Sequence, residues 1–225
     1  MFVRDFMTKN PISISPDDNL PQAINVSRKN HIRHLPVLDG YGKLVGIVVE
    51  KDLLSNQPSP ATTLSVYEIY ALLESLRIRQ IMSRPVITVT GDCPIEEAAR
   101  IMVENKISCL PVMDGEVLVG IITETDVFKV LVEVLGGHED GFRFTLRMPE
   151  KVGVLSSVSG AIAEAGGNIV AVTSSGVYEG QRDTMIKETG ADRERMTELI
   201  RKTGVEIIDM RSSSRFQPFL FGKPG

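Results

Sequence analysis

A threonine and an aspartate three residues apart form the pair of side chains best suited to ligand chemistry. Thr123 and Asp126 follow an apolar, strand-like stretch, at the point where a helix is expected to begin. A carboxylate accepts hydrogen bonds from both vicinal hydroxyls of a ribose, and a hydroxyl at this spacing lies on the same side of the helix start. The spacing therefore fits a ribose-binding pair, although on spacing alone a helix cap explains it better. The alternative needs no ligand: the two residues form a capping box and nothing more.

The segment around this pair occurs twice in the chain, in three matching blocks that keep their order. The blocks lie at residues 7–15, 30–37 and 44–52 in the first copy and at 82–90, 105–112 and 118–126 in the second. Such self-similarity is the mark of a structural repeat. Hydrophobic periodicity and turn residues predict the order β-α-β-β-α in each copy, with helices at about residues 20–30 and 95–105.

The two copies differ at the threonine. Val49 stands where the second copy has Thr123, whereas Asp52 matches Asp126. A valine side chain can neither donate nor accept a hydrogen bond. We therefore expect two unequal sites with the second dominant, so that Asp126→Ala weakens ligand binding more than Asp52→Ala does.

Both copies resemble the CBS motif, which occurs in pairs called Bateman modules, over about residues 1–135. The resemblance implies an adenosine-containing effector (AMP, ADP, ATP or S-adenosylmethionine), no required cofactor, and a base slot formed by the first strand of the same copy. Besides Thr123 and Asp126, the second-site candidates are Ile87, Thr88, Ile107, Pro111 and Ile122. The weaker first-site candidates are Ile12, Ser13 and Asp52. Taken singly, each apolar candidate is better explained as a core residue.

Two basic residues are the candidates for binding phosphate. Arg33 and His34 precede the Leu-Pro-Val strand of the first copy, where nucleotide-binding relatives in the CBS family carry basic residues that face the phosphates. The second copy has Ser108 and Cys109 there. The alternative is that Arg33 is a solvated surface charge and His34 a hydrogen-bonded polar residue near the interface.

Beyond residue 140 the pattern predicts β-α-β-β-α-β, the ferredoxin-like order. The turn Val152–Leu155 resembles the Pro-Gly-Val-Leu turn of ACT domains, and Gly167–Ile169 resembles the entry to their second strand. This resemblance implies an amino-acid effector site with Gly153 and Asn168 as candidates. The alternative is that the domain only dimerises and the two residues serve backbone geometry. No side-chain cluster suited to an α-amino-acid is evident, which favours that alternative.

The predicted fold class is therefore α+β, a tandem CBS pair followed by a ferredoxin-like ACT domain. The predicted domains are CBS motif 1 (1–61), a linker helix with CBS motif 2 (62–135), the ACT domain (140–212) and a tail (213–225) with Phe216, Phe219 and Phe221. The linker helix, about residues 64–77, has an apolar stripe that fits a core contact or a dimer contact. This arrangement resembles the acetoin-utilisation AcuB-type family, which implies a regulator linked to acetoin or acetate metabolism.

The composition excludes several other classes. The net charge is −4 and no segment forms the basic face that nucleic-acid binding needs. No apolar run is long enough to span a membrane, and the first residues lack the apolar core of a signal peptide. Two cysteines without metal-ligand spacing indicate a reducing compartment and no metal site.

The three histidines, His31, His34 and His138, belong to no catalytic motif, so we expect no catalytic residues and no enzyme. The chain is predicted to be a cytoplasmic, homodimeric regulator that acts on an unidentified protein, without membrane or nucleic-acid partners. Two alternatives stay open: a structural dimerisation protein with vestigial CBS sites, and an amino-acid sensor that acts through the ACT domain.

Overall fold

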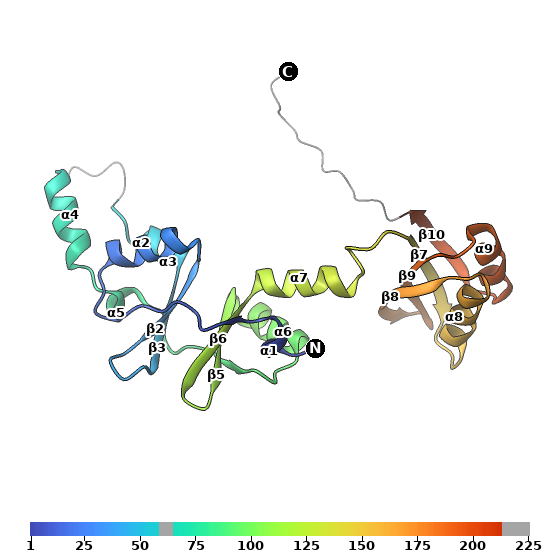
Figure 1. Cartoon of the computed structure of the whole chain (residues 1–225), viewed down its shortest axis with the longest axis horizontal. Coiled ribbons are helices and arrows are strands. Elements are labelled where there is room, and N and C mark those ends of the chain that lie inside the picture. Colours follow the sequence, from blue (N-terminus) through green and yellow to red (C-terminus); the bar gives the residue numbers. More distant parts are fainter. Residues whose placement is uncertain (59–64, 213–225) are drawn as a thin grey trace, which may run out of the picture. The chain divides into compact units, whose positions relative to one another are not determined.

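The computed structural model describes residues 1–58 and 65–212 (Figure 1). The chain divides into two compact units, Met1–Phe128 and Lys129–Gly225, each of which is described by itself. The predicted tail with Phe216, Phe219 and Phe221 lies outside the described residues. Within the described ranges, no helix is both long and apolar enough to cross a lipid bilayer.

The first unit holds the two copies of the repeat. The first copy consists of α1 (Val3–Phe6), β1 (Thr8–Lys9), α2 (Leu20–Asn30), β2 (His34–Leu38), β3 (Leu44–Val49) and α3 (Glu50–Ser55). The second consists of α4 (Val66–Ser75), α5 (Ile78–Ile81), β4 (Val89–Thr90), α6 (Ile95–Asn105), β5 (Cys109–Asp114), β6 (Val117–Thr123) and the start of α7 (Glu124–Val134), which continues into the second unit. The helices predicted at 20–30 and 95–105 are confirmed as α2 and α6.

Local chemistry explains why α2 begins and ends where it does. At its start the Asn19 side chain accepts from the backbone N–H of Gln22 at 2.9 Å, and the Gln22 side chain accepts from the Asn19 N–H at 2.8 Å. This reciprocal pair satisfies two donors that the helix leaves open. At its end His31 takes the left-handed conformation, with φ of 53°. Leu20 and Ala23 face the core of the first copy, which also includes Leu35 and Val37.

Each copy's lead-in segment starts against the last strand of the other copy. Thr8 pairs with Ile121 of β6, and Ser83 pairs with Ile47 of β3. Each segment then crosses to its own copy, where Ile14 pairs with Val37 and Val89 pairs with Val112. The two copies are therefore joined by exchanged strands, and each lead-in segment passes close to the hairpin of its partner copy.

Helix α4, part of the predicted linker helix, is largely exposed. It has no buried residue, and its apolar side chains Val66 and Tyr70 are 64% and 62% exposed. Leu73 and Leu76 pack against the core of the first copy. The sequence stripe thus makes a core contact only at its C-terminal end. The homodimer stays a prediction.

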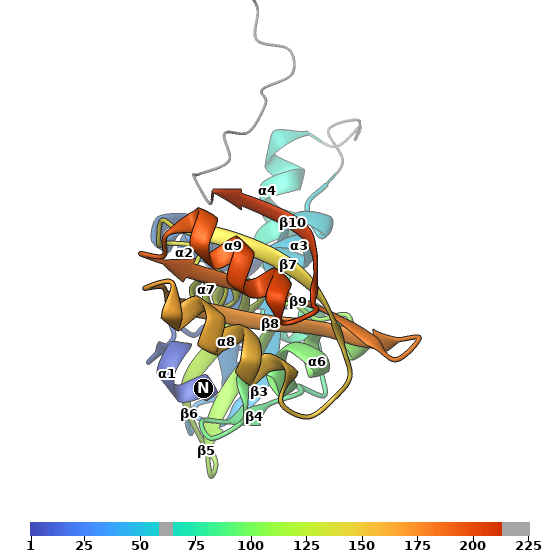
Figure 2. The same cartoon turned by 90° about the vertical axis from the view of Figure 1, so that its right-hand side faces the viewer.

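The second unit confirms the ferredoxin-like order of the ACT domain. Its elements are β7 (Phe142–Pro149), α8 (Val154–Glu164), β8 (Asn168–Tyr178), β9 (Gln181–Thr189), α9 (Arg193–Lys202) and β10 (Glu206–Ser212). The antiparallel sheet has the order β10-β7-β9-β8. Figure 2 shows both helices on one face of it. The core of this unit includes Phe144, Ile162, Ile186 and Met196.

Glu188 is an acid buried in this second unit. Its side chain is fully buried, with Oε2 accepting from the Ala191 N–H at 3.1 Å and Oε1 making no hydrogen bond among the described residues. Burial raises the pKa of the Glu188 carboxyl, and the Ala191 N–H offsets this only in part. At pH values below the unfolded-state pKa, the Glu188 carboxyl is protonated in both states and does not reduce the stability of the fold. As the pH rises through the higher folded-state pKa, the buried carboxyl ionises and the folded state progressively loses stability.

Glu188→Gln keeps the side-chain volume and the acceptor for the Ala191 N–H but removes the charge. We expect the melting temperature of this variant to exceed that of the parent chain at pH 8 and to approach it at pH 4. Differential scanning calorimetry at both pH values measures this. A difference in melting temperature that is the same at both pH values would show that charging of Glu188 is not the cause.

Candidate functional site

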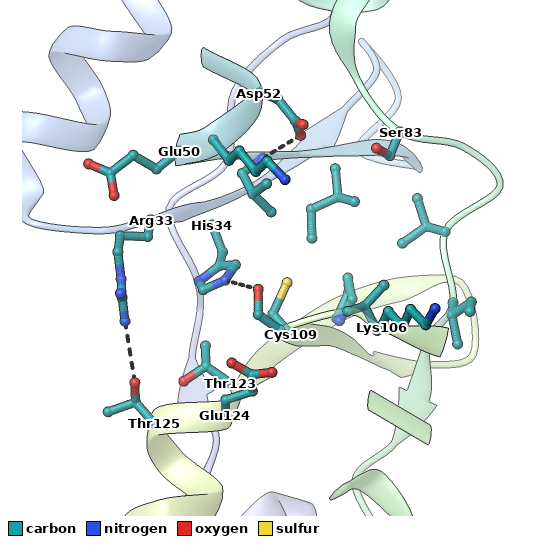
Figure 3. Close-up of a pocket in the computed structure, with 18 of the residues that line it drawn as sticks. Arg33, His34, Glu50, Asp52, Ser83, Lys106, Cys109, Thr123, Glu124 and Thr125 are labelled. Atoms are coloured by element: carbon teal, nitrogen blue, oxygen red, sulfur yellow. Dashed lines mark hydrogen bonds between the residues drawn. The ribbon is translucent and has the colours of Figure 1, made fainter. Parts of the chain in front are cut away.

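A cavity of about 530 Å³ lies between the two copies of the repeat (Figure 3). Its size is in the range of small-molecule sites. Both hairpins and both final helices contribute to it, together with the segment that leads into the second copy. The lining residues are Arg33, His34, Ile47, Val49, Glu50, Lys51, Asp52, Ser83, Pro85, Val86, Ile87, Lys106, Ile107, Ser108, Cys109, Pro111, Thr123, Glu124 and Thr125.

Asp52 is the aspartate that lines this cavity. It sits in the first turn of α3, where its Oδ2 accepts from the backbone N–H of Val49 at 3.1 Å. Its Oδ1 accepts no hydrogen bond from any part of the chain that the structure describes. The side chain therefore caps its helix with one oxygen and keeps the other available to a ligand hydroxyl.

Thr123 and Asp126 form the capping box that the sequence left open as an alternative. The Asp126 Oδ2 accepts from the N–H of Thr123 at 3.1 Å and from its hydroxyl at 2.7 Å. Asp126 is only 9% exposed and does not line the cavity, whereas Thr123 does. The ribose role of this pair stays a prediction.

The apolar candidates for the base slot separate into two groups. Ile87, Ile107 and Pro111 line the cavity, together with Val86. Ile122, by contrast, is fully buried in the core. Thr88 lines a second hollow of about 760 Å³, whose other lining residues include Lys43, Arg84 and Glu116.

The structure groups these candidates across the copies. Ile87 shares the cavity with Asp52 of the first copy, because Ser83 starts the lead-in segment against Ile47 of β3. Ile12 and Ser13 are exposed, do not line this cavity, and follow β1, which pairs with β6 of the second copy. Of the set predicted for the second site, the cavity contains Ile87, Ile107, Pro111 and Thr123 but not Asp126.

Arg33 and His34 lie in the cavity and bridge to the second copy. The Arg33 guanidinium donates to the Thr125 hydroxyl at 3.4 Å, and His34 Nε2 is 2.8 Å from the Ser108 hydroxyl. Burial, and then the positive charge of Arg33, lower the pKa of His34, against a smaller opposing effect of nearby acids. The His34 imidazole is thus largely neutral at pH 7.

In the ACT domain the two effector candidates lie at opposite ends of one helix. Gly153 precedes α8 in the left-handed conformation, with φ of 90°, while Asn168 follows the end of that helix. A helix of 11 residues is about 16 Å long. Gly153 and Asn168 of one chain therefore do not converge on one small ligand.

Several lining residues escaped the sequence analysis, most of all Glu50 and Glu124. These two glutamates occupy matching positions of the repeat, directly after Val49 and Thr123. Their occurrence in both copies was the signal that could have identified them. Lys106 and Ser108 flank the candidate Ile107 and also face the cavity.

Two family models match the chain. The CBS domain model matches residues 3–59 and 78–133, and the TTHA0829-like ACT domain model matches residues 140–211. The uncharacterized protein MJ1426 of Methanocaldococcus jannaschii is 36% identical over 155 residues, which cover 59% of this chain and 92% of that protein. Inosine-5′-monophosphate dehydrogenase of the same organism is 32% identical over 126 residues, which cover 56% of this chain and only 22% of the enzyme.

Solved structures resemble the CBS pair. A Vibrio cholerae protein named for acetoin utilization (AcuB) has a TM-score of 0.51 and 32% identity, over 61% of this chain and 95% of that one. CBSX2 in complex with AMP has a TM-score of 0.51 and 26% identity, over 59% of this chain and 97% of that one. The predicted order of a CBS pair followed by an ACT domain is confirmed.

Proposed function

Since the chain belongs to the CBS-domain family, with a TTHA0829-like ACT domain after its CBS pair, we propose that it is a non-catalytic regulatory protein. It binds an adenosine-containing ligand and acts on a target protein in response. The ligand binds in the cavity between the two copies. The observation that carries the proposal is the combination, in one cavity, of an aspartate with an available oxygen and an apolar slot. The AMP bound to the similar CBSX2 supports the choice of an adenosine group.

In this proposal the adenine lies in the slot between Val86, Ile87 and Ile107, and its ribose faces Asp52. The flat apolar surface of a base suits aliphatic walls, and the backbone of an extended segment offers hydrogen-bonding groups to its edge. Arg33 and His34 lie on the side of the cavity open to the 5′ substituent. Thr123 of the second predicted ribose pair also lines this cavity, whereas Asp126, Ile12 and Ser13 do not.

Ligand binding would act on the relative arrangement of the two CBS copies, and the effect is limited by the ligand's differential affinity for the arrangements. The free thiols Cys93 and Cys109 are consistent with a cytoplasmic regulator. Its target is an unidentified protein, and the similarity to the Vibrio cholerae AcuB protein supports a place in acetoin or acetate metabolism.

Isothermal titration of the full chain with adenosine, AMP, ATP and S-adenosylmethionine tests the proposal. We expect saturable binding of at least one of them and much weaker binding of guanosine, whose exocyclic groups differ at the base edge. Absence of binding by all four adenosine compounds would overturn the proposed function.

A further inference from the structure

The charged residues of the cavity balance one another. Three lining residues are basic (Arg33, Lys51 and Lys106) and three are acidic (Glu50, Asp52 and Glu124). Within the described ranges none of these six makes an ion pair within the 4.0 Å limit, and His34 is largely neutral. A nucleotide polyphosphate carries several negative charges and needs an excess of cationic donors, which this cavity does not supply.

The two helix starts at the cavity are also poor sites for a phosphate. Helix N-termini attract anions through their open N–H groups. Here the N–H groups of Glu50 and Glu124 donate to the backbone carbonyls of Arg33 and Ser108, at 2.8 and 3.0 Å. Each first turn also carries two acids of its own. The anion-binding end of each helix is therefore already occupied by protein carboxylates.

The charges are arranged along the cavity in a definite order. Figure 3 shows Arg33 and Glu50 near one end and Ser83 and Lys106 toward the other, with Glu124 between them. In the proposed arrangement, with the base beside Ser83 and the ribose at Asp52, the 5′ substituent extends from Asp52 toward Arg33 and Glu50.

The middle of the cavity presents a carboxylate. Glu124 lies close enough to His34 and Cys109 to raise the pKa of each, although burial is the main influence on both groups. The Ser108 hydroxyl is engaged with His34 at 2.8 Å. A phosphate at the 5′ carbon would be repelled by Glu124, whereas a positively charged group there would be attracted.

The far end of the cavity offers one cation and one anion. The Arg33 guanidinium has a single long hydrogen bond, to the Thr125 hydroxyl, and Glu50 forms no ion pair with it among the described residues. An α-amino acid presents a carboxylate for an arginine and an ammonium for a glutamate. Arg33 and Glu50 together match both groups.

We propose that the cavity is selective for an adenosyl sulfonium with an amino-acid end, the chemistry of S-adenosylmethionine, over adenine nucleotides. This inference rests on the proposed function and assigns the 5′ side of the same site. Glu124 faces the sulfonium, Arg33 the carboxylate and Glu50 the ammonium. The Arg33 expected from sequence to bind phosphate binds a carboxylate instead.

Competitive titration of the full chain tests the selectivity. We expect S-adenosylmethionine to bind about 10-fold more tightly than S-adenosylhomocysteine, which lacks the sulfonium charge, and AMP and ATP to bind more weakly than adenosine. Glu124→Gln should reduce the S-adenosylmethionine preference over S-adenosylhomocysteine to within about 2-fold. Glu96→Gln, in the exposed first turn of α6, makes the same charge change away from the cavity and should preserve the preference.

The outcomes separate the two proposals. Tighter binding of AMP or ATP than of adenosine would overturn the sulfonium selectivity and leave the adenosine site intact. Equal affinities for the sulfonium and the thioether, or a preference that survives Glu124→Gln, would overturn it as well. Failure of adenosine and every adenosyl compound to bind would instead overturn the proposed function itself.

Discussion

Asp52→Asn is expected to weaken adenosine binding by about 10-fold or more, the effect of losing a charge-assisted hydrogen-bond acceptor. Asparagine keeps the shape of the side chain and can still accept from the Val49 N–H, so α3 keeps its cap. Only the charge and the second carboxylate oxygen are lost. Isothermal titration measures the affinity, and an unchanged melting temperature verifies the fold.

Asp126→Asn is the matched control, because it makes the same change at the equivalent position of the other copy. The sequence ranks Asp126 above Asp52 since Thr123 accompanies it, and that ranking stays a prediction. The cavity favours the opposite order: Asp52 lines it, while the Asp126 Oδ2 accepts two hydrogen bonds from Thr123. A larger loss for Asp126→Asn than for Asp52→Asn would contradict our assignment of the ribose to Asp52.

Gly141→Ala is expected to destabilise the ACT unit by about 2–3 kcal/mol, through a clash that the sheet cannot relieve. A Cβ at Gly141 would lie 2.2 Å from the backbone carbonyl oxygen of Glu188. Phe142, the next residue, pairs with Glu188 in the β7–β9 ladder. Since the obstructing atom belongs to a paired backbone, moving it away breaks strand pairing.

Gly160→Ala provides the control for this substitution. A Cβ at Gly160, within α8, meets nothing within 4 Å, so alanine should stabilise the unit by about 0.5–1 kcal/mol through helix propensity. Urea denaturation of the full chain measures both changes, and hydrogen exchange of β7 and β9 assigns the loss to the ACT sheet. A Gly141→Ala variant as stable as the parent chain would contradict the close approach of Gly141 to the Glu188 carbonyl between β7 and β9.

Local patterns in the sequence were sufficient for most of the secondary structure. The capping residues Asn19 and Gln22 and the left-handed residue His31 bound α2 within a short stretch of chain. The Thr123–Asp126 box is likewise local, and the structure confirms its cap. Such elements could be predicted because a hydrogen bond between residues three apart depends little on the rest of the fold.

Other features depend on contacts between residues far apart in the chain. The apolar stripe of α4 fitted a core contact, yet Val66 and Tyr70 are exposed, because the pattern does not say whether a partner surface exists. Whether a surface covers that stripe depends on residues far along the chain, so the burial of α4 could not be inferred from its own residues.

By itself the sequence determined the repeat, the order of a CBS pair and an ACT domain, and the presence of an aspartate at the start of each final helix. The tertiary structure alone decided which aspartate shares a cavity with Ile87. That choice depends on the pairing of Ser83 with Ile47, which joins the second copy's lead-in segment to the first copy's hairpin. This strand exchange leaves no local signature in the sequence. The alternation of apolar residues in the lead-in segment is the same whether the segment pairs with the hairpin of its own copy or with that of the other copy.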